Sequence, residues 1–417
     1  MPGDWARAVR KADNEIWVAL TFLGLLAIAW WWLHSFPLAI VGSLGSLTTG
    51  TLYLWQRECL TAVSYRRTLT ASRAEFGEEV ALEIEIVNDK LLPVPWLHIE
   101  DWLPSSLELR GGTVTGDRTT ARLVNVLPLL PYQRVRRRVT VLCRERGLHL
   151  FGPAILRSGD PVGLRTRSAR VEDQQRLLVY PKRFALDPLG VVSRVLIGDI
   201  RARQQFLEDP SRIAGVREYR VGDPLRSIDW RATARSAALL VRHFEPTVSL
   251  RVTLFVDFHV PQAYSWPRDT SQLEFTIALG ASLLSELAER QVAIGLFASG
   301  SVGSDLVAFS ASSAPSQLSL VFEALARCSA ESAVPFSSVL KAQNAHLRPG
   351  TSVVVVASDY PEQTLEALAE LRRRHTVTAV WVQGDQGAPP PREQVDRLLR
   401  VGFTNDWRES DILELAA

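Results

Sequence analysis

The longest apolar stretch of the chain lies near its N-terminus. No Asp, Glu, Lys or Arg occurs in residues 16–56, a run about twice as long as the 20 residues that a helix needs to cross a bilayer. Polar and helix-breaking residues at 34–37 interrupt the run at its midpoint. The pattern therefore predicts a hairpin of two membrane-spanning helices, residues 16–33 and 38–55, after a short N-terminal segment, residues 1–15. Trp and Tyr near the ends of both spans are typical of an interfacial aromatic belt.

Basic residues on both sides of this run predict its orientation. They are Arg7, Arg10 and Lys11 before it, and Arg57, Arg66, Arg67 and Arg73 after it. The turn has none, so the positive-inside rule places both ends in the cytoplasm. We therefore expect a multi-pass protein of the bacterial inner (cytoplasmic) membrane, with both termini and the soluble domains in the cytoplasm. The three cysteines, Cys59, Cys143 and Cys328, are too few and too widely spaced for a disulfide framework, which agrees with a reducing compartment.

Residues 60–165 have the alternation of β-structure. In residues 80–87, Leu82, Ile84 and Ile86 alternate with glutamates, as in a strand with one buried face. Further short strands at 96–99, 107–109, 120–126 and 134–142 predict a small β-sandwich. Arginines alternate with valines in residues 134–141, which favours a solvated strand face over a phosphate-binding patch. The glycine-rich residues 146–164 are expected to be a connection that closes the sandwich.

The overall charge gives no support for nucleic-acid binding. Lys and Arg number 47 against 45 Asp and Glu, a formal net charge of +2, whereas phosphate neutralisation needs clustered basic surface. We expect no nucleic-acid partner.

The chemistry-bearing residues concentrate in a motif at 215–245, within a connecting segment at 166–247. Asp223, before Pro224, is expected to cap a short helix. The arginines at 226, 231 and 235 suggest an anion-binding cluster, and Asp223 with Asp229 suggests an acid–base pair. The alternative is a set of interlocked ion pairs with Trp230 as an apolar anchor. Balanced charges favour this alternative, because the nearby arginines hold both carboxylates ionised.

The pattern G-V-R-E-Y-x-x-G-D-x-x-R-x-I-D-W-x-A-T-A-R, followed by L-x-V-R-x-F-E, resembles the signature of the domain-of-unknown-function 58 family. The resemblance extends to the layout of the chain, since such proteins have two N-terminal membrane helices, a β-rich segment, this motif and a von Willebrand factor A-like domain. It implies partnership with a MoxR-type AAA+ ATPase in the assembly or maturation of client proteins, and it brings no catalytic activity. The interaction motif that it implies comprises Arg217, Glu218, Tyr219, Gly222, Asp223, Arg226, Asp229, Trp230 and Arg235.

Residues 248–417 alternate between strand and helix patterns. We expect strands at 250–258, 292–297, 306–309, 351–357 and 377–382, and helices at 271–290, 364–374 and 392–400. Such alternation predicts a doubly wound α/β sheet with its ligand site at the carboxyl ends of the strands. The resemblance implies that this domain is von Willebrand factor A-like.

Two carboxylates occupy the positions where that ligand site is expected, Asp257 and Asp359. Von Willebrand factor A-like domains bind Mg²⁺ through D-x-S-x-S at the first position, but His259 and Pro261 stand where the serines should be. Because Mg²⁺ prefers oxygen ligands, we expect a degenerate site that is empty or binds a divalent metal only weakly. His259 also suggests a transition-metal site with the two aspartates.

The chain contains no G-x-x-x-x-G-K-[ST] sequence and so no P-loop of its own. We therefore expect a membrane-anchored, non-catalytic adaptor of an AAA+ ATPase, with no cofactor and with a client that the sequence does not name. One alternative is a metal-dependent hydrolase that uses Asp257, His259 and Asp359. Another is an envelope or cell-wall scaffold without an ATPase partner.

Overall fold

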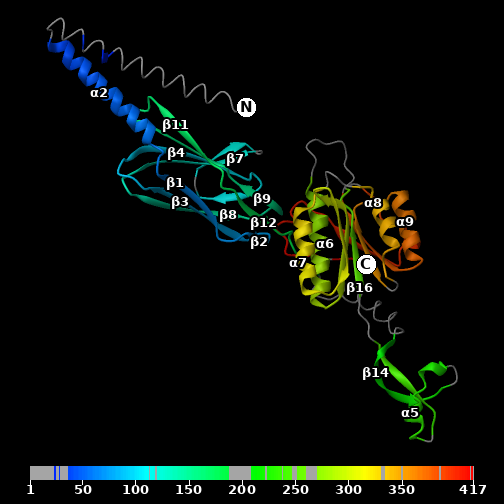
Figure 1. Cartoon of the computed structure of the whole chain (residues 1–417). Coiled ribbons are helices and arrows are strands. Elements are labelled where there is room, and N and C mark those ends of the chain that lie inside the picture. The colour runs from blue at the N-terminus through cyan, green and yellow to red at the C-terminus, as the bar shows by residue number, and fades with distance from the viewer. Residues whose placement is uncertain are drawn as a thin grey trace. The chain divides into compact units, whose positions relative to one another are not determined.

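The computed structural model describes residues 23–24, 28, 36–111, 113–117, 120–186, 208–220, 223–236, 238–246, 251–259, 270–329, 334–348, 351–384, 387–413 and 415–416. The chain divides into two compact units, Met1–Val179 and Tyr180–Ala417. Both contain sheets, and the second combines strands with helices (Figure 1).

The first unit is a β-sandwich. Its two larger sheets have the strand orders β1-β3-β8-β5 and β11-β10-β4-β7-β6, and a smaller sheet has the order β2-β12-β9. The strands are β1 (Val63–Leu69), β2 (Arg73–Ala74), β3 (Glu79–Asn88), β4 (Val94–Leu103), β5 (Glu108–Arg110), β6 (Thr113–Asp117), β7 (Thr120–Leu129), β8 (Arg134–Leu142), β9 (Gly147–Phe151), β10 (Ala154–Gly159), β11 (Thr166–Val171) and β12 (Gln175–Val179). Leu82, Ile84, Leu97 and Leu123 are among the residues that fill the space between the sheets.

The polar alternation of this unit behaves as the sequence predicts. Strand β3 buries Leu82, Ile84 and Ile86, and β8 buries Val139 and Val141 while its arginines face solvent. Arg136 and Arg134 both lie beside Glu85 of the paired strand, with Nε–Oε1 distances of 2.9 and 3.7 Å. The predicted sandwich strands and the solvated arginine face are therefore confirmed.

The glycine-rich residues 146–164 are not a simple connection, which corrects that prediction. They contain strands β9 and β10, of which β10 pairs with β4 and β9 with β12. The glycines mark the ends of these strands, because Gly147, Gly152 and Gly163 all have positive φ angles. Such backbone conformations suit glycine, so the glycines punctuate the strands.

The predicted membrane hairpin is not confirmed. Its first helix, residues 16–33, lies outside the described residues except for Leu23, Gly24 and Ile28. Its second helix corresponds to α2 (Phe36–Glu58). Among the helices described by the structure, none has the length and apolarity needed to cross a membrane. This finding contradicts the expected multi-pass protein of the bacterial inner membrane and, with it, the orientation read from the flanking charges.

The composition of α2 explains the error. The helix has no charge before Arg57, but it carries many small and hydroxyl residues. Thr48 and Thr51 bond back to the carbonyls of Leu44 and Leu47 at 2.7 and 2.8 Å. Lack of charge is therefore a poorer criterion than mean apolarity.

The second unit contains a six-stranded sheet of order β18-β17-β16-β19-β20-β21. Its neighbouring strands are parallel except for the antiparallel β17–β18 pair. The elements are β16 (Arg251–Val256), α6 (Ser271–Glu289), β17 (Ala293–Val302), β18 (Asp305–Ser312), α7 (Pro315–Arg327), α8 (Phe336–Asn344), β19 (Ser352–Ala357), α9 (Glu362–Arg372), β20 (Thr376–Gln383), η3 (Arg392–Gln394) and β21 (Arg397–Gly402). The short strands β13 (Ala185–Leu186) and β22 (Ile412–Leu413) pair with each other.

Helices cover both faces of this sheet (Figure 1). Leu254 of β16 packs in one core with residues of α6 and α7, whereas Phe255, its neighbour in the strand, packs in another with residues of α8 and α9. A strand buried on both sides has no polar face, which explains the continuous apolar runs. The predicted mixed α/β architecture is therefore confirmed.

The predicted closing helix at residues 392–400 is wrong. Only the 3₁₀ turn η3 forms there, followed by edge strand β21. In β21, Leu399 and Val401 are buried while Arg400 and Gly402 are exposed, a period of two that belongs to a strand. The alternating arginines resembled the polar face of a helix.

Candidate interaction surface

The motif at 215–245 folds as a β-hairpin. Strands β14 (Glu208–Glu218) and β15 (Leu240–Pro246) are antiparallel, with Val216 opposite Arg242 and Arg217 opposite Val241. The chain between them forms η2 (Leu225–Ser227) and the single-turn helix α5 (Trp230–Thr233). Ile228 and Val241 are buried and form an antiparallel backbone bridge, which joins the connecting loop to strand β15.

Asp223 holds the first half of this loop. It accepts two hydrogen bonds from the guanidinium of Arg217, at 2.7 and 2.6 Å, and one from the Arg220 backbone N–H at 2.9 Å. The Arg217 hydrogen bonds are the main reason that the pKa of Asp223 falls to about 2. The predicted cap is wrong, because η2 has Pro224 at its N-cap position and no side-chain cap.

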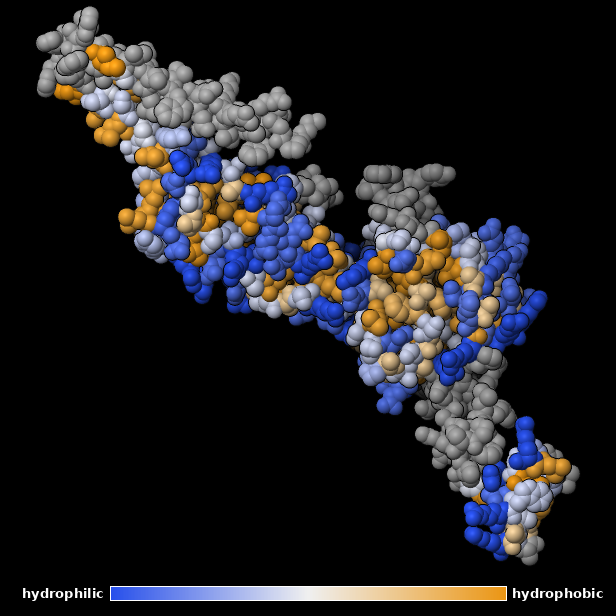
Figure 2. Space-filling view, viewed as in Figure 1, coloured by the Kyte–Doolittle hydropathy of each residue, from blue (hydrophilic) through white to orange (hydrophobic). Residues whose placement is uncertain are grey.

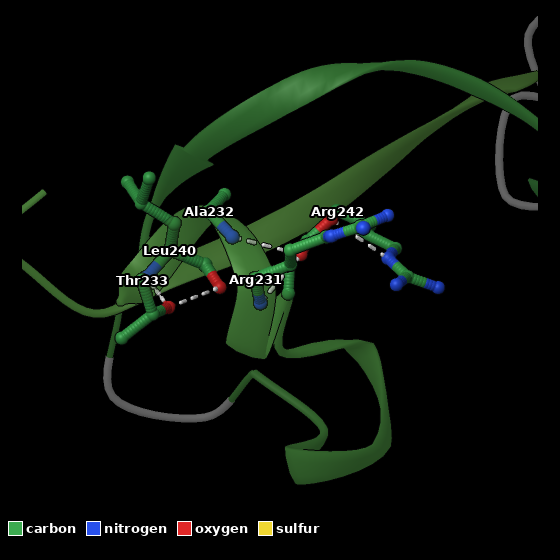
Figure 3. Close-up of polar contacts among 6 residues, drawn as sticks. Arg231, Ala232, Thr233, Leu240 and Arg242 are labelled. Atoms are coloured by element: carbon green, nitrogen blue, oxygen red, sulfur yellow. Dashed lines mark hydrogen bonds and ion pairs between the residues drawn. The ribbon is translucent and has the colours of Figure 1, made fainter. Parts of the chain in front are cut away.

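Asp229 holds the second half, and this residue is the helix cap. Its Oδ1 accepts from the N–H groups of Arg231 and Ala232, both at 3.0 Å, and its Oδ2 accepts from Arg242 Nε at 3.0 Å (Figure 3). The Ala232 hydrogen bond, followed by that from Arg242, lowers the pKa of Asp229. Both loop carboxylates thus stay ionised and hydrogen-bonded, an arrangement that suits fixing a shape rather than transferring protons.

One further contact closes the loop. The Thr233 hydroxyl accepts a hydrogen bond from the Leu240 N–H at 3.0 Å, which ties the end of α5 to the start of β15 (Figure 3). Each half of the connection is therefore fixed by polar side chains of its own. Ion pairs do form, as Arg217–Asp223 and Arg242–Asp229, but they are two separate pairs within the hairpin rather than one interlocked set.

Trp230 does not anchor the hairpin, which corrects that prediction. Its side chain is 67% exposed, and Leu225 in η2 is 71% exposed. Figure 2 shows apolar residues at the surface of the hairpin beside strongly hydrophilic ones. The buried residue of this loop is Ile228 instead. A tryptophan held on a fixed loop and open to solvent is typical of binding surfaces, since such residues often dominate the energy of an interface.

The remaining motif residues lie on or near this exposed region. Arg226, Arg231 and Arg235 are exposed, as is Glu218, whereas Tyr219 is partly buried and donates its N–H to the Leu239 carbonyl at 2.9 Å. Gly222 lies outside the described residues. We call Leu225, Arg226, Trp230, Arg231 and Arg235 the hairpin surface.

Sequence reasoning missed the exposure of Leu225 and the role of Arg242. No local pattern separates Leu225 from a buried leucine, since buried residues such as Ile84 also have polar sequence neighbours.

The two carboxylates at the edge of the α/β sheet have different surroundings. Asp257, just after β16, is 4% exposed and accepts hydrogen bonds from the Ser299 hydroxyl and the His259 N–H, both at 3.0 Å. Burial raises its pKa to about 6. Asp359, after β19, is partly buried and accepts from the Ala388 N–H at 3.0 Å.

The donor set at this edge lacks the two serines of the Mg²⁺ site that the resemblance implies, because His259 and Pro261 stand at those positions. Within the described parts of the chain, no group of three or more His, Cys, Asp or Glu side chains could hold a metal ion. Asp257, His259 and Asp359 all belong to those parts and do not form such a group. The Ser299 hydroxyl is already hydrogen-bonded to Asp257, and Mg²⁺ demands a near-octahedral set of oxygen ligands.

The fold and the motif together define an α/β protein with an exposed β-hairpin. Residues 215–393 match the family model described as "Protein of unknown function DUF58". The match begins at the first glycine of the motif and takes in most of the hairpin and most of the six-stranded sheet. The resemblance read from the motif is thereby confirmed for this part of the chain.

The uncharacterized protein YeaD of Bacillus subtilis (strain 168) is 26% identical over 238 residues, which are 56% of this chain and 55% of that relative. The chain thus covers about half the length of the curated relative that it matches.

Among solved structures, a cohesin module of a family 33 glycoside hydrolase from Clostridium perfringens ATCC13124 has 12% identity and a TM-score of 0.21, covering 28% of this chain and 97% of that one. A non-cellulosomal cohesin from Archaeoglobus fulgidus has 10% identity and a TM-score of 0.20, covering 28% and 91%. Scores this low support no argument.

Proposed function

We propose that the protein is a non-catalytic interaction protein that docks onto a partner protein through the hairpin surface. The observation that carries this proposal is the exposure of Trp230 on a loop held by Asp223 and Asp229. Large aromatic residues lose apolar contact with water when they bind, and they are enriched among the residues that dominate interface energies. A loop that is already fixed loses little further conformational freedom on binding.

The partner that the motif suggests is a MoxR-type AAA+ ATPase. This partner is carried over from the resemblance, and residues 215–393, which include the whole of the hairpin surface, match the model of that family. The ATPase would supply the nucleotide cycle, since this chain has no P-loop. The protein described here would link that cycle to the assembly or maturation of a client protein.

The α/β sheet is proposed to be von Willebrand factor A-like. The strand order β18-β17-β16-β19-β20-β21 corresponds to the order 3-2-1-4-5-6 of doubly wound sheets. An antiparallel edge strand, β18, and helices on both faces also support this proposal.

Co-purification of the tagged full-length protein from its own host, with and without a non-hydrolysable ATP analogue, tests the partner. We expect a MoxR-type ATPase among the recovered proteins, enriched by the analogue and lost with Trp230→Ala. Leu320→Ala is the matched control, because Leu320 is 51% exposed on α7, away from the motif in sequence. Recovery of envelope proteins without an ATPase contradicts the proposed partner and favours a scaffold.

A further inference from the structure

We infer that the segment bound by the hairpin surface is an acidic stretch of a protein that also carries apolar side chains. This inference rests on the proposed function and adds the chemistry of the partner. The charges that support it are those of residues 215–242, where six arginines stand against Glu218, Asp223 and Asp229.

The charges around Trp230 are mostly positive. Arg217 and Arg242 form ion pairs with Asp223 and Asp229, whose side chains are partly exposed. Arg220, Arg226, Arg231 and Arg235 are exposed, and Glu218 is the exposed acid among residues 215–220, 223–236 and 238–242. The whole chain has a net charge of only +2. The excess of exposed positive charge is thus a property of residues 215–242, and it favours an acidic partner.

Apolar side chains share the same hairpin. Besides Trp230 and Leu225, Val216 and Leu239 are exposed large hydrophobic residues. Arginine and tryptophan together are the residue types most enriched among interface hot spots. A polyanion without apolar groups would neutralise the arginines but leave these side chains in contact with water, so the better fit has both kinds of group.

A protein segment fits this surface better than a nucleic acid does. Proteins that bind single strands stack successive bases on several aromatic rings in a basic groove. Among residues 215–220, 223–236 and 238–242, Trp230 is the exposed aromatic residue, Tyr219 is partly buried, and the other exposed apolar groups are aliphatic. Aliphatic side chains suit leucine-like groups of a partner.

Fluorescence polarisation with labelled synthetic peptides tests the inference on the full-length protein. The main probe is a peptide in which glutamates alternate with leucine and phenylalanine. The comparison probes are the same peptide with lysine in place of glutamate, a glutamate-only peptide, and an oligouridine. We expect the acidic apolar peptide to bind at least about tenfold more tightly than each of the others, and to weaken as salt increases.

Variants locate the binding on the hairpin surface. The triple variant Arg226→Gln, Arg231→Gln, Arg235→Gln and the single variant Trp230→Ala should each weaken binding of the acidic apolar peptide at least about tenfold. All four side chains are exposed, so these variants should fold normally. Arg373→Gln and Leu320→Ala, which alter exposed residues of other elements, should bind as the wild type does.

The outcomes separate this inference from the proposed function. Absence of peptide binding to the wild type overturns the inference, as does equal binding of the glutamate-only peptide or tighter binding of oligouridine. If the ATPase is nevertheless lost with Trp230→Ala, the proposed function stands without it. If Trp230→Ala leaves ATPase recovery unchanged, the proposed docking surface itself is wrong, whatever the peptides do.

Discussion

Two Arg–Asp pairs in this protein have opposite surroundings. In the sandwich, Arg67 and Asp101 form an ion pair with both side chains fully buried, and the Tyr65 hydroxyl donates to Asp101 at 2.7 Å. In the hairpin, Arg217 makes a similar pair with Asp223, but its side chain is 42% exposed. Burial raises the pKa of Asp101 even beside Arg67, whereas hydrogen bonds from Arg217 lower the pKa of Asp223.

The two Arg–Asp pairs have different roles because one is buried and the other is exposed. A buried pair becomes costly when one partner is lost, because the other charge is left in an apolar interior. An exposed pair contributes little to global stability, since water screens it and solvates whichever charge remains. The sandwich pair therefore supports the fold, and the hairpin pair shapes a surface on which Trp230 and Leu225 are presented.

The largest expected effect is at the buried pair. Asp101→Ala should destabilise the sandwich by about 3–5 kcal/mol, because Arg67 is left buried without its carboxylate. Urea unfolding, with hydrogen exchange in β3 and β4, measures the loss. The double variant Arg67→Met, Asp101→Leu should recover much of it, since apolar residues of similar size replace a buried pair well. If the double variant lost as much free energy of unfolding as Asp101→Ala, the effect would not come from the unpaired charge of Arg67.

The next effect acts on the same pair through the backbone. Gly152 has φ +98°, and a Cβ there would clash with Arg67 Nη2 and lie 2.7 Å from the Asp173 carbonyl. Gly152→Ala should therefore lower the free energy of unfolding by about 2 kcal/mol or more through the clash. This loss comes in addition to the roughly 1–2 kcal/mol that a left-handed backbone costs any alanine. Gly163→Ala isolates that second contribution, because Gly163 has φ +77° and nothing within 4 Å. Equal unfolding free energies for the two variants would show that Arg67 has room to move.

Asp257 is a buried carboxylate whose hydrogen bonds come from Ser299 and the His259 N–H, so it shows the effect of burial without an arginine partner. Burial raises the pKa of Asp257 to about 6 from the ordinary aspartate value of 3.8. Between about pH 4 and pH 6 the folded state binds more protons than the unfolded state, so stability falls as pH rises through this window and is constant above it. Asp257→Asn should remove this dependence and stabilise the α/β unit at neutral pH by about 1–3 kcal/mol.

Denaturant titrations at a series of pH values, with a chelator present, measure the Asp257 effect. Asp359→Asn is the matched variant, and it should change neutral-pH stability less, because Asp359 is only partly buried. A wild-type stability that rises between pH 4 and pH 6, with Asp257→Asn abolishing the rise, would contradict the predicted sign.

The smallest effect on stability is expected at the exposed pair. Asp223→Asn should leave the global unfolding free energy almost unchanged but speed hydrogen exchange at the backbone N–H of Arg220, which donates to Asp223. Binding through the hairpin surface should weaken, because the loop that presents Leu225 is less fixed. Asp305→Asn, an exposed acid in β18, is the control. A global destabilisation comparable to that of Asp101→Ala would remove the distinction between the pairs.

Much of the fold could be predicted from local patterns. The alternation of Leu82, Ile84 and Ile86 predicted β3, and the unbroken apolar run at 353–356 predicted a central parallel strand, because both depend on which faces are buried. Strand β21 and helix α2 were harder to predict. In β21 the spacing of the arginines resembled a helix, although burial alternates every second residue as in a strand. In α2 the sequence has no charge before Arg57, but its many hydroxyl residues make it less apolar than that lack of charge suggests.

The candidate site was only partly predictable. The ion pairing of the motif followed from its balanced charges, but the partners Arg217–Asp223 and Arg242–Asp229 depend on the pairing of β14 with β15. Trp230 was expected to be buried because large aromatic residues usually are. In the structure Ile228, which precedes α5, pairs with Val241 and is buried, whereas Trp230 at the start of α5 is exposed.

The central claim is that the hairpin surface binds the ATPase, and a direct binding measurement tests it most sharply. Purified MoxR-type ATPase from the same host, held in its nucleotide-bound form, would be titrated with the full-length wild type, Trp230→Ala and Leu320→Ala. The proposal predicts that Trp230→Ala weakens binding about 30-fold or more, as expected for a hot-spot tryptophan, with Leu320→Ala unchanged. Equal affinity of the wild type and Trp230→Ala would contradict it.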